Sequence, residues 1–257
     1  MRNKLNNDFV FSIVLNGFVL LASLLLFVPH FEENDDAFLA MISEGVYGTR
    51  DYHLIYANVI LGKLYVFLSG ICDCVRWHSV LQYAFLFVAF CLLTYILCKR
   101  YRGRLIAAFF VLASFYELYV SLQYSKTAAF VSMVGFLSVF YGSDWLKCTY
   151  KDEQSFVPQG RGQALTIIII GTICCLYGML LRSSGFYLAG LFAAVTLGFR
   201  IVFRLIPVCA NKADSKVRAV FVDEVKKIML FIPVLALLAM TSVVNEKMYS
   251  DSARVFS

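Results

Sequence analysis

Long apolar runs alternate with short polar segments along this 257-residue chain. A helix needs about 20 apolar residues to cross a hydrocarbon core about 30 Å thick, and several runs reach or approach that length. The pattern predicts seven spans, at residues 9–29, 79–98, 105–122, 128–145, 164–181, 184–203 and 228–244. We therefore expect an all-α, polytopic transmembrane helix bundle, forming a single domain over residues 1–257.

The first apolar run follows Arg2 and Lys4 and ends at Pro29. A signal peptide would be followed by a cleavage site of small residues, whereas this run continues as His30-Phe31-Glu32. We therefore expect a retained membrane anchor. An external acidic loop is predicted at 30–78 and an external tail at 245–257.

One further apolar stretch, residues 53–71, is ambiguous. Asn58, Gly62 and Tyr65 recur at helical spacing, which places them on one side of a helix. This favours an amphipathic helix lying along the membrane surface. Together with an amphipathic helix expected just after Asn34, it would give the acidic loop two juxtamembrane helices.

The distribution of basic residues sets the expected orientation. With a cytoplasmic N-terminus and no crossing at 53–71, 16 of the 23 Lys and Arg lie inside and seven lie outside. A crossing at 53–71 with the same N-terminus would place the basic loops outside, which the positive-inside rule disfavours. Eight spans with an external N-terminus remain an alternative. We expect a multi-pass protein of the cytoplasmic membrane.

Composition supports a membrane environment and gives no sign of nucleic-acid binding. Hydrophobic residues make up 60% of the chain and charged residues 16%, against about 45–50% and ~25% in soluble domains. The net charge of +6 resides in loops between spans. Cys72 and Cys74 lack the further ligands that a zinc site needs, so no metal site is expected there.

The acidic loop carries the candidate chemistry. Asn34 is a predicted N-cap, Asp35 and Asp36 occupy the first helical turn, and Gly45 is a predicted C-cap. Acidic residues are stabilised there by the helix dipole. The two carboxylates could therefore serve only to cap the helix.

The succession of features over about residues 9–100 resembles the first external loop of GT-C class membrane glycosyltransferases, in particular poorly characterised bacterial relatives of that class. The motifs that carry the resemblance are Asn34-Asp35-Asp36, Gly45-x-Tyr47-Gly48 and His53-Leu54-Ile55-Tyr56-x-Asn58. The resemblance implies a polyprenyl-phosphate-linked sugar as donor and a cell-envelope glycan, lipid or protein as acceptor. It also implies that Asp35 or Asp36 is the catalytic carboxylate.

Such a transfer needs a base for the acceptor hydroxyl and positive charge on the departing phosphate. Basic side chains on the predicted outer face that could bind the substrate are Arg50, His53, Lys126 and Arg182. Lys126 could instead pair with Glu117, Arg182 could be an interfacial anchor, and His53 could be structural. No cofactor is expected, although two carboxylates beside a phosphate could hold a divalent cation.

Other functions remain open from the sequence. An envelope-polysaccharide polymerase or ligase would handle similar donors, and a non-catalytic membrane protein would not need the carboxylates. A transporter is disfavoured because the span centres carry almost no charge. GT-C members usually have eight or more spans, so a seven-span chain is expected to be a fragment, a minimal form or a degenerate relative.

Overall fold

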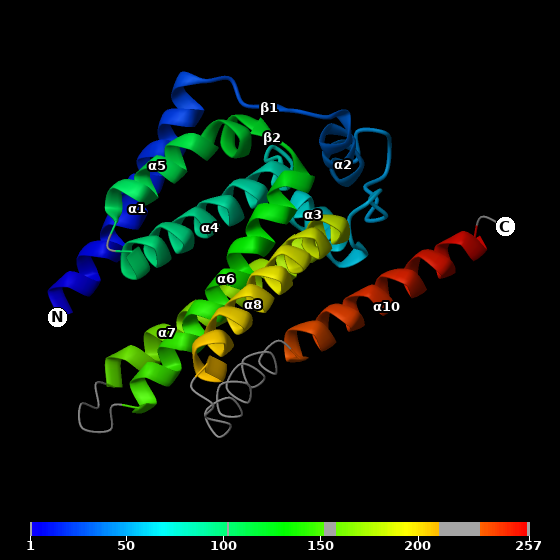
Figure 1. Ribbon diagram of the computed structural model, residues 1–257. Coiled ribbons are helices and arrows are strands. Elements are labelled where there is room, and N and C mark those ends of the chain that lie inside the picture. The colour runs from blue at the N-terminus through cyan, green and yellow to red at the C-terminus, as the bar shows by residue number, and fades with distance from the viewer. Residues whose placement is uncertain (1, 102, 152–157, 211–231, 256–257) are drawn as a thin grey trace.

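The computed structural model describes residues 2–101, 103–151, 158–210 and 232–255, and most of them are helical (Figure 1). The elements are α1 (Arg2–Leu26), β1 (His30–Phe31), α2 (Asn34–Glu44), α3 (Val59–Ile71), α4 (Trp77–Tyr101), α5 (Arg104–Phe115), the π-helical turn η1 (Tyr116–Val120), β2 (Ser121–Leu122), α6 (Tyr124–Lys151), α7 (Pro158–Leu181), α8 (Ser183–Ala210) and α10 (Ile232–Val255). The predicted all-α membrane bundle is confirmed.

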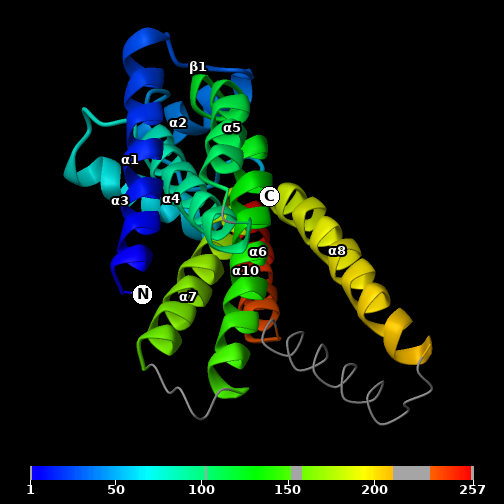
Figure 2. The same ribbon diagram turned by 60° about the vertical axis from the view of Figure 1, so that its left-hand side comes forward.

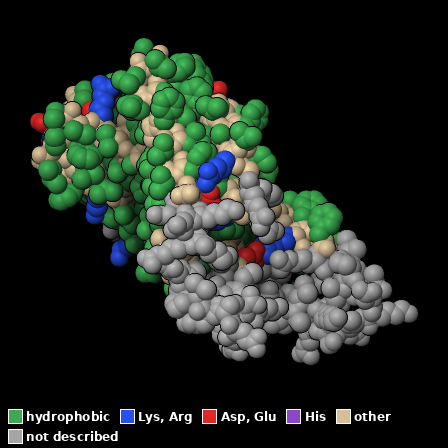
Figure 3. Space-filling model, turned by 90° about the vertical axis from the view of Figure 1, so that its left-hand side faces the viewer, with side chains coloured by type: hydrophobic (Ala, Val, Ile, Leu, Met, Phe, Trp, Pro, Cys, Tyr) green, Lys and Arg blue, Asp and Glu red, His purple; other side chains and the backbone are tan. Residues whose placement is uncertain are grey.

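Five helices in the described part of the chain are long and apolar enough to cross a membrane. They correspond to five of the predicted spans and comprise Asn7–Leu26, Trp77–Lys99, Tyr124–Asp144, Gly162–Leu181 and Ser183–Phe203. Hydrophobic side chains cover most of the described surface in Figure 3, as expected of a surface in contact with lipid. The protein is therefore a multi-pass membrane protein.

The two other predicted spans are not among these five helices. The apolar run at 105–122 forms the 12-residue helix α5, the turn η1 and the short strand β2. The run predicted at 228–244 begins among residues outside the described ones, and its described part belongs to α10. A continuous apolar run therefore does not by itself predict one regular α-helix over its whole length.

Glycines let α6 and α7 approach each other closely. A Cβ atom added at Gly178 would lie 2.1 Å from the Ser132 hydroxyl oxygen, and one added at Gly171 would lie 2.7 Å from the Ser138 Cβ atom. Small residues at helix contacts are the usual means of close packing in membranes. In contrast, α8 diverges from α6 and α7 towards its C-terminal end (Figure 2).

The segment between α1 and α2 is joined to the segment between η1 and α6. Strands β1 and β2 pair in parallel, and the Glu32 N–H donates to the Leu122 carbonyl oxygen at 3.0 Å. The pairing holds the acidic start of α2 against the start of α6. This end of the bundle collects residues from α2, α4, α6 and the α7–α8 turn.

The ends of α2 and α3 differ partly from the expected ones. The predicted C-cap Gly45 is confirmed, with φ +80° and its N–H on the Ile42 carbonyl at 3.2 Å. The N-cap of α2 is Glu33, and Asn34 is the first helical residue. The helix expected over 53–71 begins only at Val59 because Asn58 caps it, its side chain accepting from the Ile60 N–H.

Candidate functional site

Asp36 is completely enclosed at the junction of three helices, with 0% of its surface exposed. His78 Nε2 lies 2.8 Å from its Oδ1 atom, and Gln82 Nε2 donates to the same oxygen at 3.0 Å. The backbone N–H of Tyr124 donates to Oδ2 at 3.0 Å. Because a buried carboxylate is stable only when hydrogen-bonded, these three groups account for its position.

The donors to Asp36 are themselves held in place. Thr127 on α6 donates its hydroxyl to Gln82 Oε1 at 3.0 Å. His78 packs edge-on against the ring of Tyr65 from α3, with centroids 5.4 Å apart. The resulting buried network, Asp36, His78, Gln82 and Thr127, fixes α2 against α4 and α6.

Asp35 lies beside this network in a more open position. Its side chain is half-buried, and the Tyr124 hydroxyl donates to its Oδ2 atom through a long hydrogen bond of 3.4 Å. The same hydroxyl accepts a hydrogen bond from Arg182 Nη1. Asp35, Tyr124 and Arg182, hereafter the rim cluster, thus place a carboxylate, a phenol and a guanidinium together.

Arg182 is oriented by several partners in the α7–α8 turn and around it. Its Nη1 atom donates to Ser125 Oγ at 2.6 Å, and its Nε atom donates to Ser184 Oγ at 2.9 Å. Its guanidinium lies 4.7 Å from the Tyr124 ring centroid and 5.3 Å from that of Tyr56. Cation–π contacts of this kind hold an arginine while leaving its charge in place.

Tyr56 has an unusual backbone. Its φ of +68° lies in the left-handed region, which non-glycine residues seldom adopt. Such conformations persist only where the surroundings impose them, and they are concentrated at functional sites. The conformation presents the Tyr56 ring to Arg182.

Lys126 binds acidic side chains that do not belong to the rim cluster. It pairs with Glu117 at 2.6 Å and with Glu32, so the pairing with Glu117 considered from the sequence is confirmed. The hydrogen bond from Lys126 holds the pKa of Glu32 below its ordinary value. Lys126 therefore joins the β1 segment to η1.

Arg50 and His53 lie on the segment between α2 and α3. His53 Nδ1 is 2.8 Å from Asp51 Oδ1, and its ring lies 5.4 Å from the ring of Tyr249. Although burial opposes it, hydrogen bonding from His53 lowers the pKa of Asp51. The Arg50 side chain is exposed and packs beside Gly45.

Sequence reasoning missed the partners of the two aspartates. His78 and Gln82 are polar residues four apart at the start of an apolar helix, a spacing that places them on one face. That signal could have identified them. Nothing local marks Tyr124, whose role depends on the fold bringing residues 35, 124 and 182 together.

Comparisons with protein-family models, with curated proteins and with solved structures found no match. Among the described residues, no group of three or more His, Cys, Asp or Glu side chains is placed to hold a metal ion. The function must therefore be argued from the geometry of the rim cluster.

Proposed function

We propose that the protein is a membrane glycosyltransferase that moves a sugar from a polyprenyl-phosphate donor to a cell-envelope acceptor. The observation that carries the proposal is the rim cluster, in which Asp35 and Arg182 meet at the hydroxyl of Tyr124. A base and a fixed positive charge are the two groups that this transfer requires.

In the proposed reaction, the oxygen of the acceptor hydroxyl bonds to the anomeric carbon of the donor sugar. Asp35 accepts the proton of that hydroxyl. The bond from that carbon to the phosphate oxygen breaks, and polyprenyl phosphate leaves with the bonding electron pair. Arg182 stabilises the negative charge on the leaving phosphate. Its planar fork of N–H donors suits a phosphate better than a lysine ammonium does.

The proposal assigns different roles to the two aspartates. Asp36 has no exposed surface and its oxygens already accept from His78, Gln82 and the Tyr124 N–H. We assign it a positioning role, since it holds the Tyr124 backbone while Asp35 contacts the Tyr124 hydroxyl. Asp35 is the half-buried carboxylate and is the proposed base.

We further propose seven spans, a cytoplasmic N-terminus and surface positions for α2 and α3. A direct contact supports the surface position of α3, because Asp36 of α2 lies 2.8 Å from His78 at the start of α4. If α3 carried the chain across the membrane, these residues would lie on opposite sides. The 13 residues of α3 span only about 20 Å at 1.5 Å per residue, which is shorter than the ~30 Å hydrocarbon core.

The test is transfer of radiolabelled sugar in proteoliposomes that contain the purified protein. Polyprenyl-phosphate hexoses and N-acetylhexosamines serve as donors, and an envelope extract serves as acceptor. We expect Asp35→Asn to reduce transfer at least ~100-fold, because general bases contribute about 10²–10⁴-fold. Glu33→Gln, which removes an exposed neighbouring acid, should leave the rate unchanged.

Equal transfer by the unmodified protein and Asp35→Asn would overturn the assignment of the base. If no donor in the panel is turned over, the glycosyltransferase proposal fails and a non-catalytic role gains support. An impermeant thiol reagent tests the orientation independently. Native cysteines are first replaced, because Cys74 is also exposed, and Tyr47→Cys, at a 67% exposed position, should then be labelled in intact cells.

A further inference from the structure

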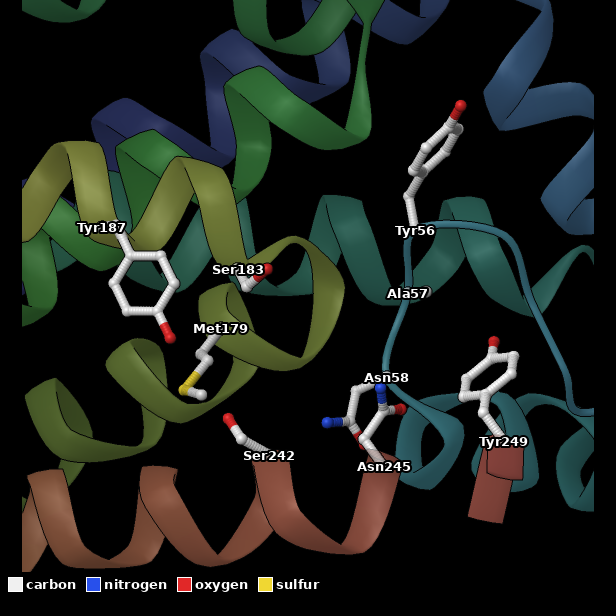
Figure 4. Close-up of a pocket in the computed structure, with 9 residues that line it drawn as sticks. All are labelled: Tyr56, Ala57, Asn58, Met179, Ser183, Tyr187, Ser242, Asn245 and Tyr249. Carbon is white, nitrogen blue, oxygen red and sulfur yellow. The ribbon is translucent and has the colours of Figure 1, made fainter. Parts of the chain in front are cut away.

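A cavity of about 320 Å³ opens beside the rim cluster, between the α7–α8 turn, the segment before α3, and α10 (Figure 4). Its volume lies at the lower end of the ~300–1,000 Å³ that is usual for ligand sites. The cavity therefore suits a small ligand or a terminal part of a larger one.

Most side chains around the cavity are polar and uncharged, and Ala57 and Met179 are apolar. The polar side chains include Tyr187, which is 60% exposed, and Tyr56, whose ring points away from the other lining side chains (Figure 4). They also include the amide of Asn245 and the hydroxyls of Ser183 and Ser242. No Asp, Glu, Lys or Arg belongs to the described lining, so the cavity favours a neutral ligand that is rich in hydroxyl groups.

The combination of an aromatic ring with amide and hydroxyl groups restricts the kind of ligand that fits the cavity. A tyrosine ring offers a flat apolar face together with a polar tip, which matches the apolar faces and the hydroxyl rim of a sugar ring. Amides and hydroxyls both donate and accept hydrogen bonds, as sugar hydroxyls do. A lipid chain would instead require a lining of aliphatic side chains.

The wall of the cavity is fixed before any ligand arrives. The Asn58 N–H donates to the Leu180 carbonyl at 2.8 Å, and the Asn58 Nδ2 atom donates to the Thr241 carbonyl at 3.3 Å. Asn245 accepts from the Val59 N–H at 2.8 Å through Oδ1. That bond orients the Asn245 amide and leaves its Nδ2 atom without a partner among the described residues.

The cavity and the rim cluster share a wall. Tyr56 lines the cavity while its ring packs against the Arg182 guanidinium, and Ser183 follows Arg182 directly in the chain. On the opposite side, the Tyr187 hydroxyl and Ser242 face the same space (Figure 4). A sugar in the cavity would therefore lie next to the proposed phosphate position.

We infer that this cavity binds a neutral sugar ring, with Tyr187 as its stacking platform. The inference rests on the proposed function and adds the chemical class of what is bound. The ring belongs either to the donor or to the acceptor, and both present the same hydroxyl chemistry.

The test uses the full chain in lipid nanodiscs, which avoids sugar-based detergents. Saturation-transfer NMR measures binding of neutral di- to tetrasaccharides of glucose, mannose, galactose and N-acetylglucosamine, with galacturonate oligosaccharides as anionic counterparts. We expect saturable binding of at least one neutral sugar. Tyr187→Ala and Ser242→Phe, which remove the platform and fill the cavity, should each weaken it at least ~10-fold, or about 1.4 kcal/mol.

Two matched variants control for general damage. Tyr187→Phe keeps the ring and should retain most of the binding, whereas Tyr47→Ala removes an exposed tyrosine outside the cavity and should change nothing. The inference is overturned if no neutral sugar binds, if the anionic sugars bind as well as the neutral ones, or if Tyr187→Ala and Ser242→Phe bind like the unmodified protein.

Failure of this inference can be told apart from failure of the proposed function. If Tyr187→Ala and Ser242→Phe do not affect transfer, the cavity has no part in the reaction, and the proposed transferase activity still holds. If sugar binds and the Tyr187 and Ser242 variants weaken binding as expected, but no transfer occurs, the sugar site is supported and the proposed transferase activity fails. Displacement of the sugar by a polyprenyl-phosphate hexose, but not by sugar-free polyprenyl phosphate, identifies the donor sugar, and displacement by neither identifies the acceptor.

Discussion

Asp35 and Asp36 are adjacent in the first turn of α2, yet their carboxylates occupy opposite kinds of environment. Asp36 is enclosed by groups from α4 and α6, whereas Asp35 is half-buried next to Tyr124 and Arg182. Successive residues of a helix point about 100° apart, so one carboxylate faces the core and the other the rim. An acidic pair in the sequence therefore need not be a functional pair.

Replacing Asp36 with Ala should lower the free energy of unfolding much more than replacing Asp35 does, and this is the largest effect that we expect. The change leaves His78, Gln82 and the Tyr124 N–H without their shared acceptor. Each buried donor left without its acceptor costs about 1–3 kcal/mol, and for these three groups together we expect a loss of unfolding free energy of about 3 kcal/mol or more. The measurement is unfolding in mixed micelles titrated with SDS.

Asp35→Ala is the matched comparison and should cost less than about 1 kcal/mol, because its only described hydrogen bond is long. Equal destabilisation by the two substitutions would contradict the division of roles. Full stability of the Asp36→Ala protein would also contradict the division of roles.

Arg182→Lys should have the next largest effect, and it should act on transfer rather than on folding. Lysine keeps the positive charge but loses the planar fork that contacts Tyr124, Ser125 and Ser184. We expect transfer to fall about 10–100-fold, or 1.4–2.7 kcal/mol. Steady-state kinetics would show whether the loss lies in kcat, as expected for stabilisation of the leaving phosphate, and an unchanged kcat would contradict that role.

Thr127→Val tests the outer part of the buried network. Valine has nearly the same shape, but it leaves the buried Gln82 Oε1 atom without its donor. We expect a destabilisation of about 1–2 kcal/mol, with transfer retained at temperatures where the protein is folded. Ser125→Ala is the neighbouring control, and it should change transfer more than stability.

Much of the fold was predictable because helical periodicity and apolar length are local properties. Five predicted spans correspond to long apolar helices, and Gly45 ends α2 as expected. The span predicted at 105–122 stays a prediction, because its residues form α5, η1 and the strand β2, which pairs with β1, in place of one long α-helix. That pairing depends on residues 91 positions away in the chain (His30 with Ser121), and periodicity carries no such information.

The candidate site was predictable only in part, for the same reason. The acidic cluster at residues 32–36 and the isolated Arg182 stand out in an apolar sequence. Their partners Tyr124 and Tyr56 look like ordinary interfacial aromatics, and their roles arise from tertiary contacts. Lys126 was predictable in part: its pairing with Glu117, nine residues away, was among the alternatives that the sequence offered, whereas its second partner Glu32 is brought to it only by the fold.

The smallest predicted effect separates Lys126 from Arg182. Lys126 lowers the pKa of Glu32, so the pair stabilises the folded protein above the ordinary glutamate pKa of about 4.3, and this contribution is lost as the pH falls through the lower pKa of the folded state. Because the Lys126 side chain is 27% and the Glu32 side chain 41% exposed to solvent, the pair should contribute about 0.2–1 kcal/mol. In Lys126→Gln this part of the acid dependence should disappear, and transfer should stay within about threefold, under ~0.7 kcal/mol. A loss of transfer as large as that of Arg182→Lys would place Lys126 at the phosphate, and the rim cluster would then need a second cation.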